Sequence, residues 1–142
     1  MLPRSRMVDF HAAMQEQLDV YPIWLLPMRN IPDTKAIFAA PNQTPTHGQG
    51  SSLNQGEHLC NVGAYGIPRK KYDFERANRE LEGVLHAHGG RKVYYSHSFY
   101  DRDFFYEDLY DGQEYFSLRD RFVADGALPE IYDKIITKNM NL

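Results

Sequence analysis

The stretch HGGRKVYYSHSFYDRDFFYEDLYDGQEYFSLRDRF, residues 88–122, is the most informative part of this chain of 142 residues. Ten of the 19 aromatic residues (10 Tyr, 8 Phe and 1 Trp) lie in it, between Tyr94 and Phe116. Rings at this density mark either the main hydrophobic core or the wall of a pocket for a flat ligand. Both interpretations are open at this point, because buried tyrosines at the edge of a core give the same pattern.

Working outward from this stretch, glycines and apolar spacing divide the chain into short elements. Gly89 and Gly90 stop a helix whose buried face carries Leu81 and Leu85, while Glu82 faces water. The predicted strands cover residues 1–3, 20–29, 58–64 and 91–97, and the predicted helices cover residues 5–19, 72–88, 102–110, 114–123 and 130–138.

This order of elements predicts an α+β fold. It is the ferredoxin-like β-α-β-β-α-β order, an antiparallel sheet with helices on one face, followed by a C-terminal helical tail. We expect a cap domain over 1–98 with a flexible, polar loop at 41–56, and a helical tail over 99–142 that packs on the cap.

The bulk composition excludes several classes of function. A formal net charge of -3 without a basic stripe argues against nucleic acid as a partner. The histidines lack metal-site spacing, and Cys60 is the only cysteine, so we predict neither a metal site nor a disulfide within the chain. We also expect no signal peptide and no transmembrane segment, and a location that is cytoplasmic or membrane-associated through a partner.

Five side chains are candidates for a binding or catalytic site. Arg29 and His97 come at or near the ends of predicted strands, where side chains commonly reach a ligand, although a surface arginine and a turn histidine are the plain alternatives. Tyr95 and Trp24 lie within predicted strands. Tyr65 lies between Gly63 and Gly66, which let a ligand or another backbone approach closely.

Several phrases of the sequence resemble a known family. VYPIWLLPMR, NVGAYGIPRKKYDFERANRELE, HGGRKVYYS and YFSLRDRF...LPEIYDKI resemble, in that order, the C-terminal part of the delta-24-sterol reductase and Diminuto-like FAD-linked oxidoreductases. A looser pattern, GGR-x-x-Y-Y before an aromatic-rich helix, is similar to vanillyl-alcohol-oxidase-type flavoproteins. The resemblance runs from about residue 1 to residue 138 and is weakest in the loop 31–56.

The resemblance implies a substrate cap for a flavin enzyme that transfers hydride to or from a C=C bond. By this comparison His97 is the catalytic candidate, Tyr95 and Arg29 are cofactor contacts, and Trp24 and Tyr65 line the substrate pocket. FAD is the implied cofactor, NADPH a possible reductant, and a sterol-like or other apolar molecule the implied substrate.

The chain departs from this family because it carries no recognisable FAD-binding module, pyrophosphate-binding segment or membrane anchor. We therefore expect FAD to bind only together with a separate FAD-binding module or chain, on which the tail over 99–142 also packs. We expect exposed apolar surface to favour self-association. Three interpretations stay open: the cap portion of an oxidoreductase, a non-catalytic interaction module, or a truncated remnant that pairs with a separate flavin-binding chain.

Overall fold

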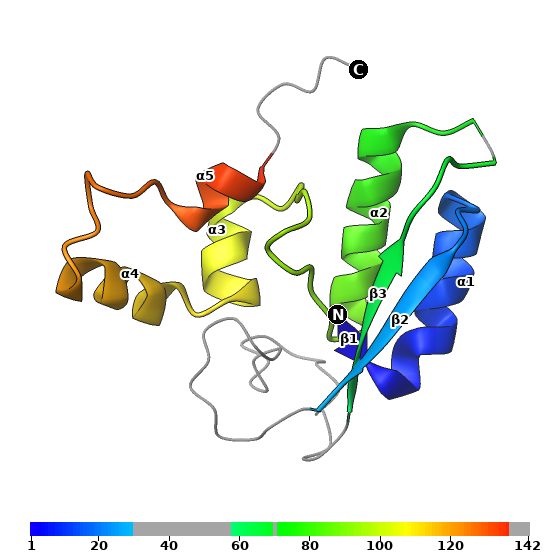
Figure 1. Cartoon of the computed structure of the whole chain (residues 1–142), viewed down its shortest axis with the longest axis horizontal. Coiled ribbons are helices and arrows are strands. Elements are labelled where there is room, and N and C mark those ends of the chain that lie inside the picture. Colours follow the sequence, from blue (N-terminus) through cyan, green and yellow to red (C-terminus); the bar gives the residue numbers. More distant parts are fainter. Residues whose placement is uncertain (30–57, 70, 137–142) are drawn as a thin grey trace.

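A computed structural model describes residues 1–29, 58–69 and 71–136. Figure 1 shows a small sheet with two long helices on one side, joined through a loop to a group of shorter helices. The predicted loop at 41–56 lies outside the described residues. The elements are β1 (Leu2–Pro3), η1 (Arg4–Arg6), α1 (Met7–Gln17), β2 (Ile23–Met28), β3 (Leu59–Ala64), α2 (Phe74–Ala87), α3 (Arg102–Phe104), η2 (Phe105–Leu109), α4 (Gly112–Arg121) and α5 (Ile131–Ile135).

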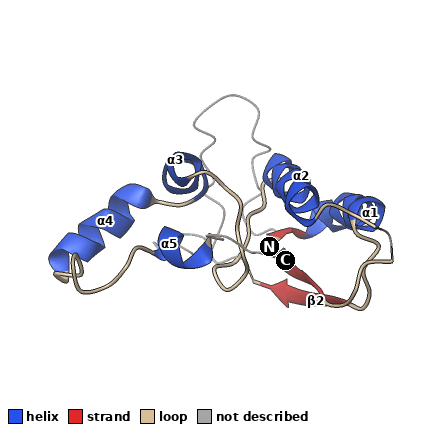
Figure 2. Ribbon diagram, turned by 90° about the horizontal axis from the view of Figure 1, so that it is seen from above, coloured by secondary structure: helices blue, strands red, loops and turns tan. Residues whose placement is uncertain are grey.

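The sheet has three strands in the order β1-β3-β2, and both pairs are antiparallel. Helices α1 and α2 lie together against one face of it (Figure 2). Between helices and sheet lies a core in which Leu2, Phe10, Met14, Leu81 and Leu85 are buried, with side chains of β3 packed against them. The mixed helix-and-strand class predicted from the sequence is confirmed.

The register of the ladder explains how two prolines fit into these strands. In an antiparallel pair, only every second residue exchanges backbone hydrogen bonds with its partner. Arg4 N donates to His58 O at 2.9 Å and Tyr65 N donates to Pro22 O at 3.2 Å. Counting from these bonds along the two registers places Pro3 and Pro27 at positions whose amide is not needed in the ladder.

The predicted strand over 91–97 is wrong. Arg91 N donates to Met1 O at 2.9 Å, and the Met1 amine donates to Arg91 O at 3.0 Å, which is a single ladder step beside β1. The chain then turns, because Val93 O accepts from both the backbone N and the Oγ of Ser96. The described residues therefore form a three-stranded sheet in place of the predicted four-stranded ferredoxin-like one.

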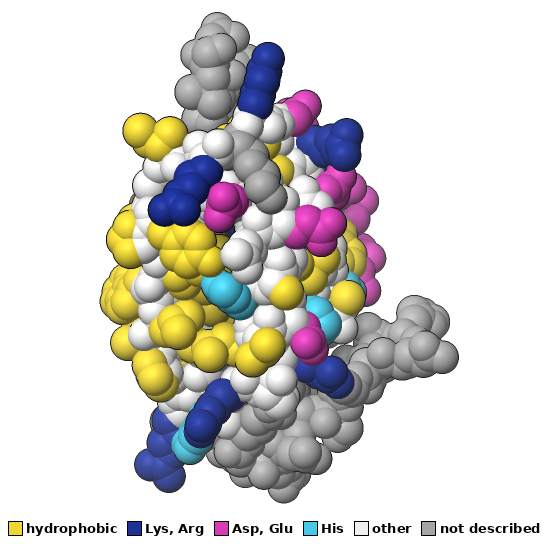
Figure 3. Space-filling model, turned by 90° about the vertical axis from the view of Figure 1, so that its right-hand side faces the viewer, with side chains coloured by type: hydrophobic (Ala, Val, Ile, Leu, Met, Phe, Trp, Pro, Cys, Tyr) yellow, Lys and Arg dark blue, Asp and Glu magenta, His cyan; other side chains and the backbone are white. Residues whose placement is uncertain are grey.

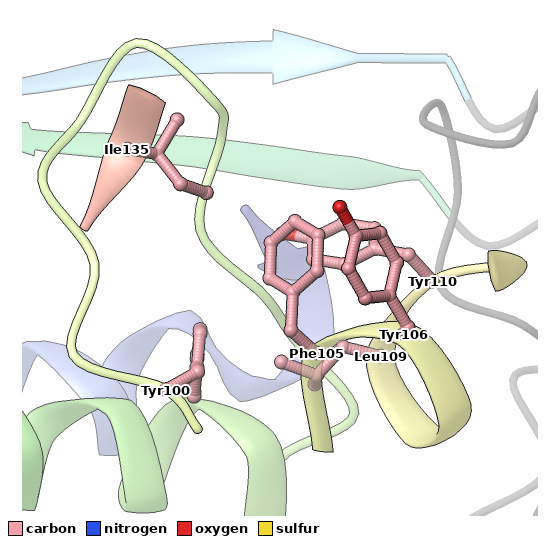
Figure 4. Close-up of a cluster of buried hydrophobic side chains, with 6 residues drawn as sticks. All are labelled: Tyr100, Phe105, Tyr106, Leu109, Tyr110 and Ile135. Atoms are coloured by element: carbon pink, nitrogen blue, oxygen red, sulfur yellow. The ribbon is translucent and has the colours of Figure 1, made fainter. Parts of the chain in front are cut away.

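The aromatic stretch forms a second hydrophobic core, so the core interpretation holds for most of its rings. Figure 4 shows the rings of Phe105, Tyr106 and Tyr110 close together. Phe105 is fully buried, and its ring centroid lies 4.5 Å from that of Tyr110. The buried members of this aromatic core are Tyr100, Phe105, Tyr106, Leu109, Tyr110 and Ile135.

Arg91 joins the two cores. Its side chain is 1% exposed, donates from Nη1 to Leu109 O, and lies with its guanidinium carbon 4.9 Å from the centre of the Tyr110 ring. A buried cation stacked on a ring fixes the orientation of the segment that carries it. This contact holds the segment that follows the single ladder step at Arg91 against η2.

Helices α2 and α4 begin after aspartate caps, and each start differs by two residues from the predicted one. Asp73 caps α2 by accepting from Arg76 N at 3.0 Å, and Asp111 caps α4 by accepting from Glu114 N at 2.9 Å. Gly112 therefore begins α4, before the predicted start at residue 114. A β-carbon at Gly112 would lie 2.7 Å from Tyr106 O, so the close approach of the two turns requires glycine. Among the described helices, none is long and apolar enough to cross a membrane.

Candidate functional site

A cavity of about 470 Å³ lies between β3, α2 and the turn over 92–97. This volume is in the range of small-molecule sites. Phe10, Met14 and Leu81, from α1 and α2, form its apolar side, and the turn closes the opposite side. The cavity lies where the sheet lacks the predicted fourth strand.

The edge of β3 that faces away from β2 contributes backbone groups to this cavity. Cys60 is the last residue of β3 paired with β1. By the alternation of the ladder, the N–H and C=O groups of Val62 and Ala64 point to the same edge as those of Cys60. Within the described part of the chain no strand pairs with that edge beyond Cys60, so these groups are available to a ligand.

One end of the cavity carries a buried ion pair. Glu82 is 3% exposed, and its Oε1 lies 2.7 Å from Lys92 Nζ. The same oxygen accepts from Phe99 N at 2.9 Å, and Lys92 Nζ also donates to His97 O at 2.8 Å. Sequence reasoning missed both residues and placed Glu82 in water. The helical spacing of α2 places Glu82 on its polar face. The sequence does not indicate that the segment carrying Lys92 folds back over that position.

The imidazole of His97 lies at the same end of the cavity. Its ring centroid is 4.8 Å from that of Phe99, edge to face. Burial, followed by the positive charge of Lys92, lowers the pKa of His97, and Glu82 opposes this in part. The neutral imidazole is therefore favoured, and a neutral ring offers one donor and one acceptor nitrogen.

Two tyrosines line the cavity near its mouth. Asn61 Nδ2 donates to the hydroxyl of Tyr95 at 3.1 Å, yet Tyr95 is 72% exposed. Tyr65 is also exposed, and its ring centroid lies 6.3 Å from that of Trp24 on the outer face of the sheet. These rings give the opening an aromatic rim with hydroxyl groups.

The structure thus brings three of the five predicted site residues together. Tyr65, Tyr95 and His97 line the cavity. Trp24 is beside Tyr65 but outside the lining, and Arg29 follows β2 at its far end, where it lines a different groove. His97 comes from a turn and not from the end of a strand.

Hydrophobic side chains gather on the face of the molecule around the outer side of the sheet (Figure 3). Trp24 is 49% exposed and Tyr65 is 52% exposed, although both are large and apolar. Leu26 and Tyr95 are further exposed members of this sheet-face patch, since Leu26 pairs with Asn61, whose side chain donates to the Tyr95 hydroxyl. Exposed apolar side chains that are contiguous in this way mark binding surfaces more often than scattered ones do.

Comparison with known proteins shows that the chain is similar to part of the delta(24)-sterol reductases. It is 34% identical over 123 residues to human delta(24)-sterol reductase, a match that covers 85% of the chain and 21% of the reductase. The mouse delta(24)-sterol reductase is 31% identical over 137 residues, which are 95% of the chain and 24% of the reductase. The delta(24)-sterol reductase homolog dhcr-24 of Caenorhabditis elegans is 26% identical over 138 residues.

These matches confirm the family resemblance read from the motifs. The chain spans about a fifth to a quarter of the length of the curated relatives it matches. No family model matches the chain, and no solved structure does.

Proposed function

We propose that the chain is the substrate-cap part of an FAD-dependent oxidoreductase that resembles delta(24)-sterol reductase. The observation that carries this proposal is the relationship to those reductases over 85–95% of the chain. The cavity supports it, because a ligand-sized space with an apolar side, an aromatic rim and charged groups at one end suits a flat, largely apolar molecule with a polar part. The reaction proposed is hydride transfer to or from a C=C bond through the flavin, and in the reductive direction NADPH would be the hydride source.

The described residues fit one face of a flavin ring better than they fit a whole dinucleotide. Tyr65 and Tyr95 offer ring and hydroxyl contacts, and the open edge of β3 offers backbone donors at Val62 and Ala64. Phosphates bind at helix N-termini, but the carboxylate of Asp73 caps the helix start nearest the cavity. FAD, which supplies the hydride chemistry when bound, would therefore be held mainly by a separate module.

In this proposal His97 is the residue that handles a proton. Its lowered pKa favours the neutral ring near pH 7, which can accept a proton from a donor or share a hydrogen bond with the cofactor. Lys92 bonds the backbone carbonyl of His97 and keeps a positive charge beside the ring. Tyr95 is the proposed cofactor contact, and Trp24 and Tyr65 are the proposed substrate contacts at the rim.

A second candidate function is a non-catalytic interaction module. It is favoured by β2, whose apolar side chains are exposed on both faces of the strand, with Leu25 46% and Leu26 40% exposed. A continuous apolar strand is normally covered on both sides. A partner chain, for example one that carries an FAD module, would cover it in either function.

The first experiment titrates FAD into the purified chain and follows the quenching of flavin fluorescence. We expect weak binding or none, because the described residues form no phosphate cradle. A stoichiometric yellow complex of micromolar affinity would show that the chain holds the cofactor unaided.

The second experiment co-expresses the chain with the FAD module of a delta(24)-sterol reductase and tests for a flavin complex that turns over. His97→Gln in that assembly should lower turnover while flavin binding is kept, and His88→Gln, outside the cavity, should change neither. An assembly that forms but does not turn over would favour the interaction module. Turnover that stays at the parent level in both His97→Ala and His97→Gln would show that His97 has no catalytic role.

A further inference from the structure

A second cavity, of about 410 Å³, lies at the opposite end of β2 from the candidate site. Helices α1 and α2 cover β3 and leave β2 at the edge of the sheet. Leu25 shares a face with Val62, which packs into the core, yet Leu25 is 46% exposed. A groove therefore runs between β2 and the start of α1, and we call it the β2 groove.

The floor of the β2 groove is apolar and its rim is basic. Leu59 and Cys60, 2% and 3% exposed, form the floor, and the remaining apolar wall consists of Met7, Leu25, Pro27 and Met28. Arg4, Arg29 and His58 complete the lining. Figure 3 shows basic side chains and a histidine side by side at the lower edge of the apolar surface.

Among the described residues, no acidic side chain in the groove balances the charge of this rim. No aspartate or glutamate is among the described residues that line it. The backbone of Arg4 is held by its N, which donates to His58 O at 2.9 Å, so these two basic residues lie opposite each other, next to the paired ends of β1 and β3. Guanidinium groups bind carboxylates strongly through paired hydrogen bonds. Thioether side chains, such as those of Met7 and Met28, adapt to flexible apolar chains.

We propose that the β2 groove binds an amphiphile with an anionic head and an apolar tail, of the long-chain carboxylate class. The head lies between Arg4 and Arg29, and the tail lies along Leu25 and the floor of the groove. This site is separate from the cavity that His97 lines, so it stands whether or not the proposed function is correct.

The test uses the full chain and dodecanoate, carbon-13-labelled at the carboxyl group, below its micelle concentration. Saturable binding is expected, with a shift of the carboxyl resonance. Arg4→Gln and Arg29→Gln should each weaken binding about tenfold, since each removes a charged hydrogen-bond donor. Both arginines are exposed, so neither substitution should affect folding. The matched control is Arg121→Gln, an exposed arginine at the end of α4.

Three further ligands test the contributions of the anionic head and the apolar tail separately. Dodecan-1-ol and dodecyltrimethylammonium keep the tail and should bind at least tenfold more weakly, and acetate keeps only the head and should not saturate. Because Cys60 is the only cysteine in the chain, the rate at which a thiol reagent modifies it reports on the groove floor, and dodecanoate should slow that rate. Equal binding of the alcohol and the carboxylate, or unchanged binding by the two arginine variants, would overturn the proposal.

Discussion

At the scale of single residues, the carboxylate of Glu82 organises the polar end of the candidate site. It accepts a hydrogen bond from Phe99 N and forms an ion pair with Lys92. Lys92 in turn donates to the backbone carbonyl of His97. The cavity wall over 92–97 is therefore held to α2 by one charged side chain. Loss of the pair would loosen the turn that carries Tyr95 and His97.

Glu82→Gln is expected to destabilise the protein by about 2–4 kcal/mol, because it leaves Lys92 without its counter-charge in a mostly buried place. Urea unfolding followed by circular dichroism measures the loss. Adding Lys92→Met to Glu82→Gln should recover part of the lost stability, because the double variant no longer has an unpaired buried charge. Strictly additive losses in the two single variants and the double variant would show that the pair contributes no coupling.

His97 gives the stability of the protein a pH dependence with a definite sign. Its pKa is lowered on folding, so the unfolded state binds more protons in the window between the folded value and the ordinary value of about 6.5. Stability contributed by His97 is therefore complete above that ordinary value and is lost as the pH falls through the window. Urea midpoints measured between about pH 7.5 and about pH 5 should fall less steeply for His97→Gln than for His88→Gln. Parallel pH profiles for the two variants would show that His97 does not cause the pH dependence of stability.

The sequence identified site residues that have reactive or aromatic side chains. It did not identify Glu82, whose role depends on its burial in the folded chain. His97, Tyr65 and Tyr95 were named from their place next to predicted strands or glycines, and the structure collects them around one cavity. Glu82 looks like any surface glutamate on α2 in the sequence. Its burial depends on where the segment after Gly90 folds back, which is a long-range contact without a local signal.

At the scale of elements, the ladder of β2 and β3 depends on which amides face the partner. The register pairs Leu26 with Asn61, a position at which both residues exchange backbone hydrogen bonds. The amide of Leu25 points instead to the outer edge of the sheet. Pro27, which has no N–H, occupies another position of this kind. The two leucines are alike in type and exposure but differ in this respect.

We therefore expect Leu26→Pro to cost about 2–3 kcal/mol more than Leu25→Pro. Proline removes a ladder hydrogen bond at position 26 and only a solvent-facing amide at position 25. Thermal and urea unfolding of the two variants measure the difference, and Leu25→Ala and Leu26→Ala correct for the lost side chains. Equal costs after that correction would mean that the register of β2 is different from the one described.

The predicted elements agree best with the structure where apolar residues keep helical spacing over several turns. The helix predicted over 72–88 is found as α2, because four apolar residues at helical spacing and the cap at Asp73 agree. The strand predicted over 91–97 has strand-forming residues, but the stacking of Arg91 on Tyr110 and the Ser96 turn outweigh that local preference. The helix predicted over 102–110 is found as α3 continued by the wider turn of η2, which packs Phe105 and Leu109 inward.

At the scale of the whole molecule, two separate cores leave one large surface uncovered. One core lies between the helices and the sheet, and the aromatic core lies under the short helices. The sheet-face patch belongs to neither, since no described helix covers that side of the sheet (Figure 2). In the proposed function this patch is where the flavin module would pack.

Exposure of this patch predicts that the isolated chain associates with itself and binds a hydrophobic probe dye. Contiguous exposed apolar side chains favour association, because two copies bury them when they meet. Trp24→Ser together with Tyr65→Ser should shift the chain toward monomer in sedimentation velocity and lower the dye signal. The control is Val123→Ser, which is 80% exposed but lies after α4, away from the sheet. A strictly monomeric, dye-negative parent protein would contradict the prediction, and so would association that persists unchanged in the double variant.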